Sequence, residues 1–144
     1  MLSDHIDGSV VHLANRDVTL IAVSRAPLSK IEAFKNRMGW RFQWVSSYES
    51  DFNFDYHVSF SKEDVAKGEV YYNYGTRKFG AEEGPGISVF YKDEKGDIFH
   101  TYSSYARGLD MFIGAYNYLD LVRKGRDERD LAWTMQWVRH HDRY

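Results

Sequence analysis

Residues 18–27 read Val-Thr-Leu-Ile-Ala-Val-Ser-Arg-Ala-Pro, and this stretch decides the fold class. Residues 18–23 are apolar and rich in β-branched side chains, which is typical of a buried parallel strand. A short loop follows, and Pro27 suits the first turn of a helix because its fixed φ angle matches helical geometry. The stretch therefore predicts a strand that leads directly into a helix, as in an α/β protein.

The sequence on both sides continues the alternation of helix and strand. Apolar residues at spacings of three and four predict a helix over residues 3–15 and a second one from Leu28 onward. Gly39 ends the second helix, because glycine readily adopts the left-handed conformation that terminates helices. Residues 42–45 predict a short strand.

The second half of the chain predicts a different arrangement. In order, it comprises an irregular segment over residues 52–76 with a strand at 69–74, a glycine-rich loop over 75–86, an antiparallel hairpin of 87–91 and 97–102, and a helix over 109–119. The tail, residues 131–144, is rich in Trp and His and predicts a short helix. Parallel strands followed by a hairpin predict a mixed sheet, and 144 residues fit a single domain over residues 1–144.

Charge and hydropathy exclude several classes of protein. The chain has 19 basic and 21 acidic residues, a net charge of −2, which gives no support for a nucleic-acid-binding protein. The longest apolar run, residues 18–23, is far shorter than the roughly 20 residues of a membrane span. Ser3, Asp4 and His5 follow the first two residues, without the basic start and apolar segment of a signal peptide. We therefore expect a cytoplasmic protein that binds neither nucleic acid nor membrane.

Aromatic residues are unusually frequent, at 17% of the chain, with eleven tyrosines and four tryptophans. Such rings bury a large area, while their O–H and N–H groups still need hydrogen-bond partners. A tyrosine-rich core and an oligomer interface account for this surplus, and an aromatic-lined ligand pocket is the alternative.

Several longer motifs stand in a fixed order along the chain. They are Val23-Ser-Arg-Ala-Pro27, Ile31-Glu-Ala-Phe34, Arg37-Met-Gly-Trp40, Trp44-Val-Ser-Ser47, Tyr102-Ser-Ser-Tyr-Ala-Arg-Gly-Leu-Asp110 and Trp137-Val-Arg139. Over nearly all of residues 2–144 the chain thus resembles the thioredoxin-like family known as domain of unknown function 899, described as predicted dithiol-disulfide oxidoreductases. The resemblance implies a three-layer thioredoxin-like α/β fold with a mixed sheet. It also implies that Pro85 is the proline, usually cis, that precedes the hairpin in this fold.

The chain departs from that family pattern at its start. Members carry a first strand and a Cys-x-x-Cys just before the segment that residues 2–7 match, whereas this chain contains no cysteine. Either the start codon is misassigned and the cellular protein is longer, or the gene has lost its redox segment. A thiolate is the nucleophile of disulfide exchange. The resemblance thus implies an oxidoreductase, while the composition argues against thiol redox activity in this form.

Loss of the first strand, which is central in a thioredoxin fold, has a structural consequence. Each backbone group that is buried without a partner costs about 1–3 kcal/mol. We expect the gap to be filled by direct pairing of residues 18–23 with the hairpin, by residues 69–74, or by a second copy of the chain. The aromatic surplus favours the second copy, and hence a homodimer.

The vacated edge of the sheet is the candidate ligand site. In the thioredoxin-like topology it is bounded by two segments and a nearby arginine, which contribute Ser24, Arg25, Pro27, Gly84, Pro85 and Arg107. A helix N-terminus and the Arg25 guanidinium favour a small anionic ligand at this edge. The aromatic rings of the chain favour an aromatic ligand as the other class. The alternative for Arg25 is a surface position or an ion pair. A homodimeric binding module is therefore the second candidate function.

No catalytic, metal or cofactor site emerges from the remaining residues. His140 and His141 are adjacent, so on a helix their side chains would point in different directions and could not coordinate one metal ion together. No zinc-binding sequence motif occurs. Asp51, Asp55 and His57 match no acid–base template, and a polar loop explains them. We therefore expect no catalytic residue, metal or cofactor.

Overall fold

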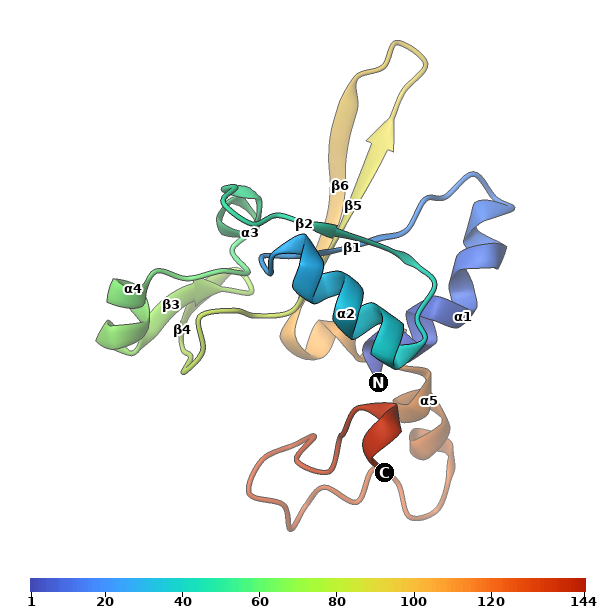
Figure 1. Ribbon diagram of the computed structural model, residues 1–144. Helices are drawn as coiled ribbons and strands as arrows, with labels where there is room; N and C mark the ends of the chain where they lie inside the picture. Colours follow the sequence, from blue (N-terminus) through green and yellow to red (C-terminus); the bar gives the residue numbers. More distant parts are fainter. The chain divides into compact units, whose positions relative to one another are not determined.

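The computed structural model describes residues 1–144 (Figure 1). The elements, in order, are α1 (Leu2–Ala14), β1 (Ile21–Ser24), α2 (Leu28–Met38), β2 (Gln43–Ser46), α3 (Phe52–Asp55), α4 (Lys62–Lys67), β3 (Glu69–Tyr72), β4 (Gly75–Lys78), β5 (Gly86–Lys92), β6 (Ile98–Tyr105), η1 (Ala106–Phe112), α5 (Gly114–Leu121) and η2 (His141–Arg143). Helices combine with parallel and antiparallel strand pairs, which confirms the predicted α/β class. The chain forms two compact units, Met1–Tyr48 with Asp110–Tyr144 (unit 1) and Glu49–Leu109 (unit 2).

Unit 1 is built on a β–α–β segment. β1 and β2 pair in parallel from Ile21 opposite Gln43 to Ser24 opposite Ser46, with α2 as the crossover between them. Ile31 and Met38 of α2 are buried with Phe42, so the apolar stripe predicted for this helix lies in the core. Gly39 ends α2 at a φ of +66°, as expected of a glycine C-cap.

The C-terminal part of unit 1 is organised around Tyr116 of α5, whose side chain is fully buried. The helix predicted over residues 109–119 is divided into η1 and α5 at Ile113, whose φ of −106° and ψ of 86° are not helical. Gly114 begins α5 against the imidazole of His5, and a Cβ at this glycine would lie 3.0 Å from Nδ1 of that ring. Close approach of another element therefore explains this glycine, as its position in the sequence indicated. The short helix predicted within residues 131–144 is limited to the three residues of η2.

Unit 2 contains two antiparallel hairpins. β3 pairs with β4, and β5 pairs with β6 through a bulge between Val89 and Phe90. The buried core consists of Phe60, Val70, Tyr72 and Tyr105. The Tyr72 hydroxyl donates to the Pro85 carbonyl at 2.6 Å and accepts from the Ala106 amide at 2.9 Å, so this buried phenol has both of its hydrogen bonds.

The sheets differ from the expected layout in one respect. Parallel and antiparallel strands occur as predicted, but they form three separate two-stranded sheets and not one continuous mixed sheet. Within the units, β1 pairs with β2 and residues 69–72 pair with β4. How the expected gap in the sheet is filled stays a prediction. Residues 52–76 are also more regular than predicted, since they hold α3 and α4. The strand predicted at 69–74 is confirmed as β3, whereas the loop predicted over 75–86 begins with β4. No peptide bond is cis, so the bond before Pro85 is trans.

Candidate functional site

The loop after β1 holds the first group of predicted ligand residues, in unit 1. The Ser24 hydroxyl accepts a hydrogen bond from Trp44 Nε1 at 3.0 Å, and the Ser46 hydroxyl donates to the Ala26 carbonyl at 2.8 Å. Pro27 is the N-cap residue of α2, and its carbonyl accepts from the Ile31 amide at 3.2 Å. Arg25 is partly buried in the same loop. These contacts give Ser24 and Pro27 structural roles and hold the loop in a fixed conformation.

The second group lies in unit 2. The Gly84 amide donates to the Val58 carbonyl at 2.8 Å, and Pro85 is held through its carbonyl by Tyr72. Arg107 is exposed in η1. A shared ligand site formed by these residues with Ser24, Arg25 and Pro27 stays a prediction.

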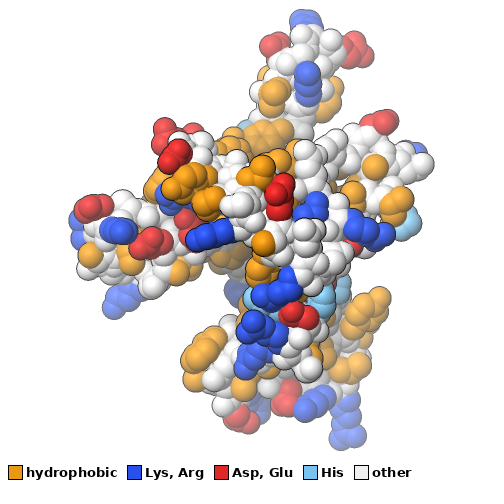
Figure 2. Space-filling view, in the orientation of Figure 1, with side chains coloured by type: hydrophobic (Ala, Val, Ile, Leu, Met, Phe, Trp, Pro, Cys, Tyr) orange, Lys and Arg blue, Asp and Glu red, His pale blue; other side chains and the backbone are white.

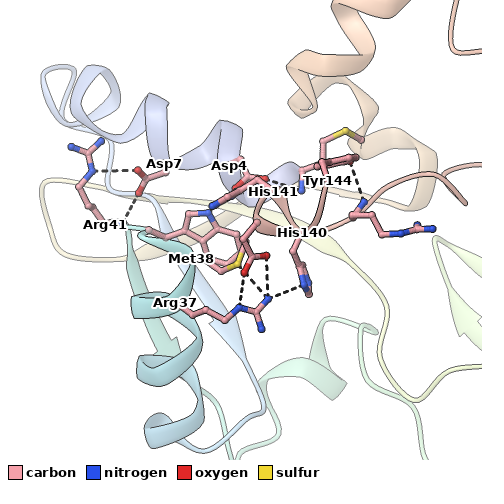
Figure 3. Close-up of polar contacts among 12 residues, drawn as sticks. Asp4, Asp7, Arg37, Met38, Arg41, His140, His141 and Tyr144 are labelled. Atoms are coloured by element: carbon pink, nitrogen blue, oxygen red, sulfur yellow. Dashed lines mark hydrogen bonds and ion pairs between the residues drawn. The ribbon is translucent and has the colours of Figure 1, made fainter.

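Unit 1 also has a cluster of charged side chains, which sequence reasoning missed. Figure 3 shows Arg37 of α2 reaching His140, while Asp4 of α1 faces His141. Arg37 Nε lies 3.0 Å from Asp142 Oδ2, and His141 Nδ1 donates to Asp4 Oδ1 at 2.5 Å. Trp40 Nε1 also donates to Asp4 Oδ1, at 2.8 Å. These contacts tie the last residues of the chain to α1 and α2.

Asp7 of α1, in the same cluster, makes a second set of contacts to another segment of unit 1. Its Oδ1 accepts the backbone amides of Arg41 and Phe42 at 2.5 Å and 3.1 Å, and its Oδ2 lies 3.3 Å from Arg41 Nε (Figure 3). Burial raises the pKa of Asp7, but these hydrogen bonds outweigh it and the net pKa is lowered. Asp7 therefore fixes the start of the β2 segment against α1.

Asp4 makes the stability of unit 1 dependent on pH. Burial raises the pKa of Asp4, but hydrogen bonds from His141, Trp40 and the Met1 ammonium group outweigh it and lower the pKa to about 2, from an ordinary value of 3.8. A carboxyl whose pKa is lowered on folding stabilises the fold above its unfolded pKa, and this contribution is lost as pH falls through the folded pKa. We expect the loss to be about 1 kcal/mol, a figure discounted because the Asp4 carboxylate is partly exposed to solvent.

The measurement is the free energy of unfolding of the wild-type protein and of Asp4→Asn, followed from neutral pH down to about 2. The difference between the two proteins should shrink as pH falls from about 5 towards 2, because the wild-type carboxyl then becomes protonated. A difference that does not change with pH would contradict the role given to the Asp4 charge.

Unit 2 contains a cavity of about 270 Å³. Its lining comprises Asp55, Tyr56, His57, Tyr71, Asn73, Tyr74, His100 and Tyr105. Asp55 and His57, which the sequence assigned to a polar loop, thus meet four tyrosines and His100. The only sequence signal for this site was the tyrosine surplus, which gives no position. A cavity of about 440 Å³ in unit 1, beside α1 and the start of β2, is lined by mixed polar and aliphatic side chains.

The fold and these sites define an α/β protein with small cavities lined by its own polar and aromatic side chains. No helix in it combines the length and the apolar character needed to cross a membrane. The sequence profile of the family described as bacterial protein of unknown function, DUF899, matches residues 1–144. The chain therefore belongs to this family. No curated protein and no solved structure matches it.

Proposed function

We propose that the chain is a thioredoxin-like module that works as a homodimer and does not itself exchange disulfides. The order β1–α2–β2, then the β5–β6 hairpin, then α5 supports the fold, because it is the order of a thioredoxin fold that lacks its first strand. The absence of cysteine from these 144 residues supports the second part, since disulfide exchange needs a thiolate.

The β5–β6 hairpin is the observation that carries the homodimer. Its strands of seven and eight residues form a two-stranded sheet, so each strand has one edge without a strand beside it. A two-stranded hairpin is marginally stable in water, and a long apolar edge strand is a ready site for pairing with another chain. The hairpin therefore supplies the surface on which a second copy would complete the sheet.

The exposed side chains of the β5–β6 hairpin also support its pairing with a second copy of the chain. Ile98 is 68% exposed, and its neighbours Tyr91 and Phe99 are at least half exposed. Figure 2 shows acidic and basic side chains together at the tip of this hairpin. The turn carries Lys92, Asp93, Glu94, Lys95 and Asp97. Mixed charges of this kind are compatible with a second copy of the same surface, whereas a strongly charged partner would need one dominant sign.

Changing Ile98 to lysine should therefore weaken the dimer by about tenfold or more, because a lysine would have to lose its hydration in the interface. The fold of the single chain should be unaffected, since Ile98 is largely exposed. Leu121→Lys is the matched control, because Leu121 is 85% exposed and lies in unit 1, outside the hairpin.

Sedimentation equilibrium over a range of protein concentrations measures this effect. The wild-type protein and Leu121→Lys should approach twice the chain mass of 16.9 kDa, while Ile98→Lys should shift towards the single-chain mass. A wild-type protein that stays at the single-chain mass at every concentration would overturn the homodimer, and equal behaviour of the two variants would place the interface elsewhere.

A further inference from the structure

We propose that the unit 2 cavity binds the quaternary or methylated ammonium group of a small organic cation. Its volume of about 270 Å³ lies just below the range of roughly 300–1,000 Å³ for drug-sized ligands, and so suits a small head group. None of its lining residues is among the ligand residues predicted from sequence, and the proposal does not depend on the thioredoxin-like reading of the chain.

The aromatic lining is the first argument for this ligand class. Aromatic faces carry a negative electrostatic potential, and cages of such rings bind quaternary ammonium groups through cation–π attraction. Four of the eight lining side chains are tyrosines and two are histidines. They form three edge-to-face pairs: Tyr56–His100 at 5.4 Å, His57–Tyr71 at 4.7 Å and Tyr74–Tyr105 at 5.5 Å between ring centroids. This packing holds the rings in place before any ligand enters.

Charge around the cavity is the second argument. Asp55 contributes a carboxylate, and the lining contains no lysine or arginine. Within the lining, an anionic ligand would therefore meet a like charge, whereas an ammonium group would be attracted both by the carboxylate and by the rings. His100 Nε2 lies 2.7 Å from the Ser103 hydroxyl and 3.1 Å from the Tyr102 carbonyl, and these contacts hold the ring against its own strand, β6.

Backbone conformation at the cavity is the third argument. His57, Asn73 and Tyr74 have φ values of +51°, +52° and +62°, in the left-handed region that is uncommon for residues other than glycine. Such residues cluster at ligand clamps, where surrounding contacts compensate for their strain. Here Arg77 donates to the Asn73 carbonyl at 3.2 Å, and the Tyr74 hydroxyl donates to the Ser103 carbonyl at 3.1 Å. Asn73 and Tyr74 form the two-residue turn of the β3–β4 hairpin, which itself requires positive φ at both positions. This turn and His57 bring three side chains to the cavity wall.

The test uses choline chloride, followed by chemical-shift changes in the NMR spectrum of the full chain, with 3,3-dimethylbutan-1-ol as the neutral compound of the same shape. We expect saturable shifts of cavity residues with choline and about tenfold weaker binding of the alcohol, because only choline has the positive charge. No saturable shift with choline would overturn the proposal. Equal affinity for the two compounds would also overturn it, since the cavity would then bind any compact apolar group.

Two variants test whether choline binds inside the cavity. Tyr71→Leu keeps an apolar side chain but removes a ring, and Asp55→Asn removes the charge with little change of shape. Each should weaken choline binding by about three- to tenfold. Tyr118→Leu is the control, because Tyr118 is an exposed tyrosine in unit 1. If circular dichroism shows that Tyr71→Leu does not fold, the choline affinity of Asp55→Asn is the deciding measurement. If Asp55→Asn binds choline as tightly as Tyr118→Leu does, the proposed site is contradicted.

Discussion

Replacing Glu128 with alanine is expected to lower the free energy of unfolding of unit 1 by about 3–5 kcal/mol. Glu128 Oε1 accepts hydrogen bonds from the Tyr116 hydroxyl at 2.8 Å, the Met135 amide at 2.9 Å and Trp137 Nε1 at 2.7 Å. Tyr116 is fully buried, so water cannot replace the lost acceptor without opening the core. One carboxylate oxygen thus links α5 to the long irregular segment that follows it.

Urea unfolding followed by tryptophan fluorescence measures this loss, because all four tryptophans lie in unit 1. Glu128→Gln keeps an oxygen acceptor but loses its charge, and should cost about 1–2 kcal/mol. Glu32→Ala, an exposed change in α2, should stay within about 0.5 kcal/mol of the wild-type protein. If Glu128→Ala were as stable as Glu32→Ala, the three hydrogen bonds would not organise this part of unit 1.

In unit 2, Tyr72→Ala is expected to have a comparable effect, a loss of about 3–5 kcal/mol. Tyr72 is 2% exposed, and its ring lies 5.8 Å from Phe60, 5.1 Å from Phe79 and 5.7 Å from Tyr105 between ring centroids. Burial raises the pKa of this phenol, so it remains protonated and continues to donate to Pro85 at ordinary pH. Removing the ring therefore leaves a large cavity and two backbone groups without partners.

Tyr72→Phe separates the ring from the hydroxyl. This variant keeps the packing but leaves the Ala106 amide and the Pro85 carbonyl without their shared partner, and should cost about 1–3 kcal/mol. The neighbouring Tyr71, half exposed on β3, provides the control Tyr71→Phe, which should be nearly neutral. Hydrogen exchange of the Val70 amide reports the stability of this unit. Equal exchange rates in all of these proteins would contradict the central role of Tyr72.

Much of the regular structure was predictable because local signals marked its ends. Pro27 and Gly39 bound α2 as expected, since one fixes a helical φ angle and the other supplies the positive φ of the C-cap. The β5–β6 hairpin was predicted from alternation on both sides of a turn in which Gly96 has a φ of +91°. The residues at the ends of α2 and in the β5–β6 turn determine where these elements begin and end, so the sequence predicts them.

The strand predicted at 69–74 is confirmed as β3, but α3, α4 and β4 were missed. The β3–β4 hairpin turns at Asn73 and Tyr74, both with positive φ, where a glycine is the usual signal and tyrosine gives none. α4, by contrast, had a readable signal, because the Ser61 hydroxyl accepts the Asp64 amide at 3.1 Å in a serine N-cap. A closer search for capping residues would have found this helix.

The unit 2 cavity could not be predicted from sequence. Its lining comes from α3 and the residues after it, from the β3–β4 hairpin and from β6, and tertiary packing alone brings these segments together. Nothing in the spacing of Tyr56, Tyr71 and Tyr105 relates them to one another. The division into separate sheets could not be predicted either. An apolar strand pattern indicates that a strand is buried, but it does not indicate which strand pairs with it.

Hydrogen exchange along residues 86–105 tests the central claim, that a second copy completes the sheet at the β5–β6 hairpin. In the wild-type protein we expect slow exchange also for those amides of β5 or β6 that do not bond across the hairpin, because a partner strand would accept them. In Ile98→Lys the same amides should exchange quickly while Val70 in β3 stays protected. Fast exchange of these edge amides in the wild-type protein at high concentration would contradict the account.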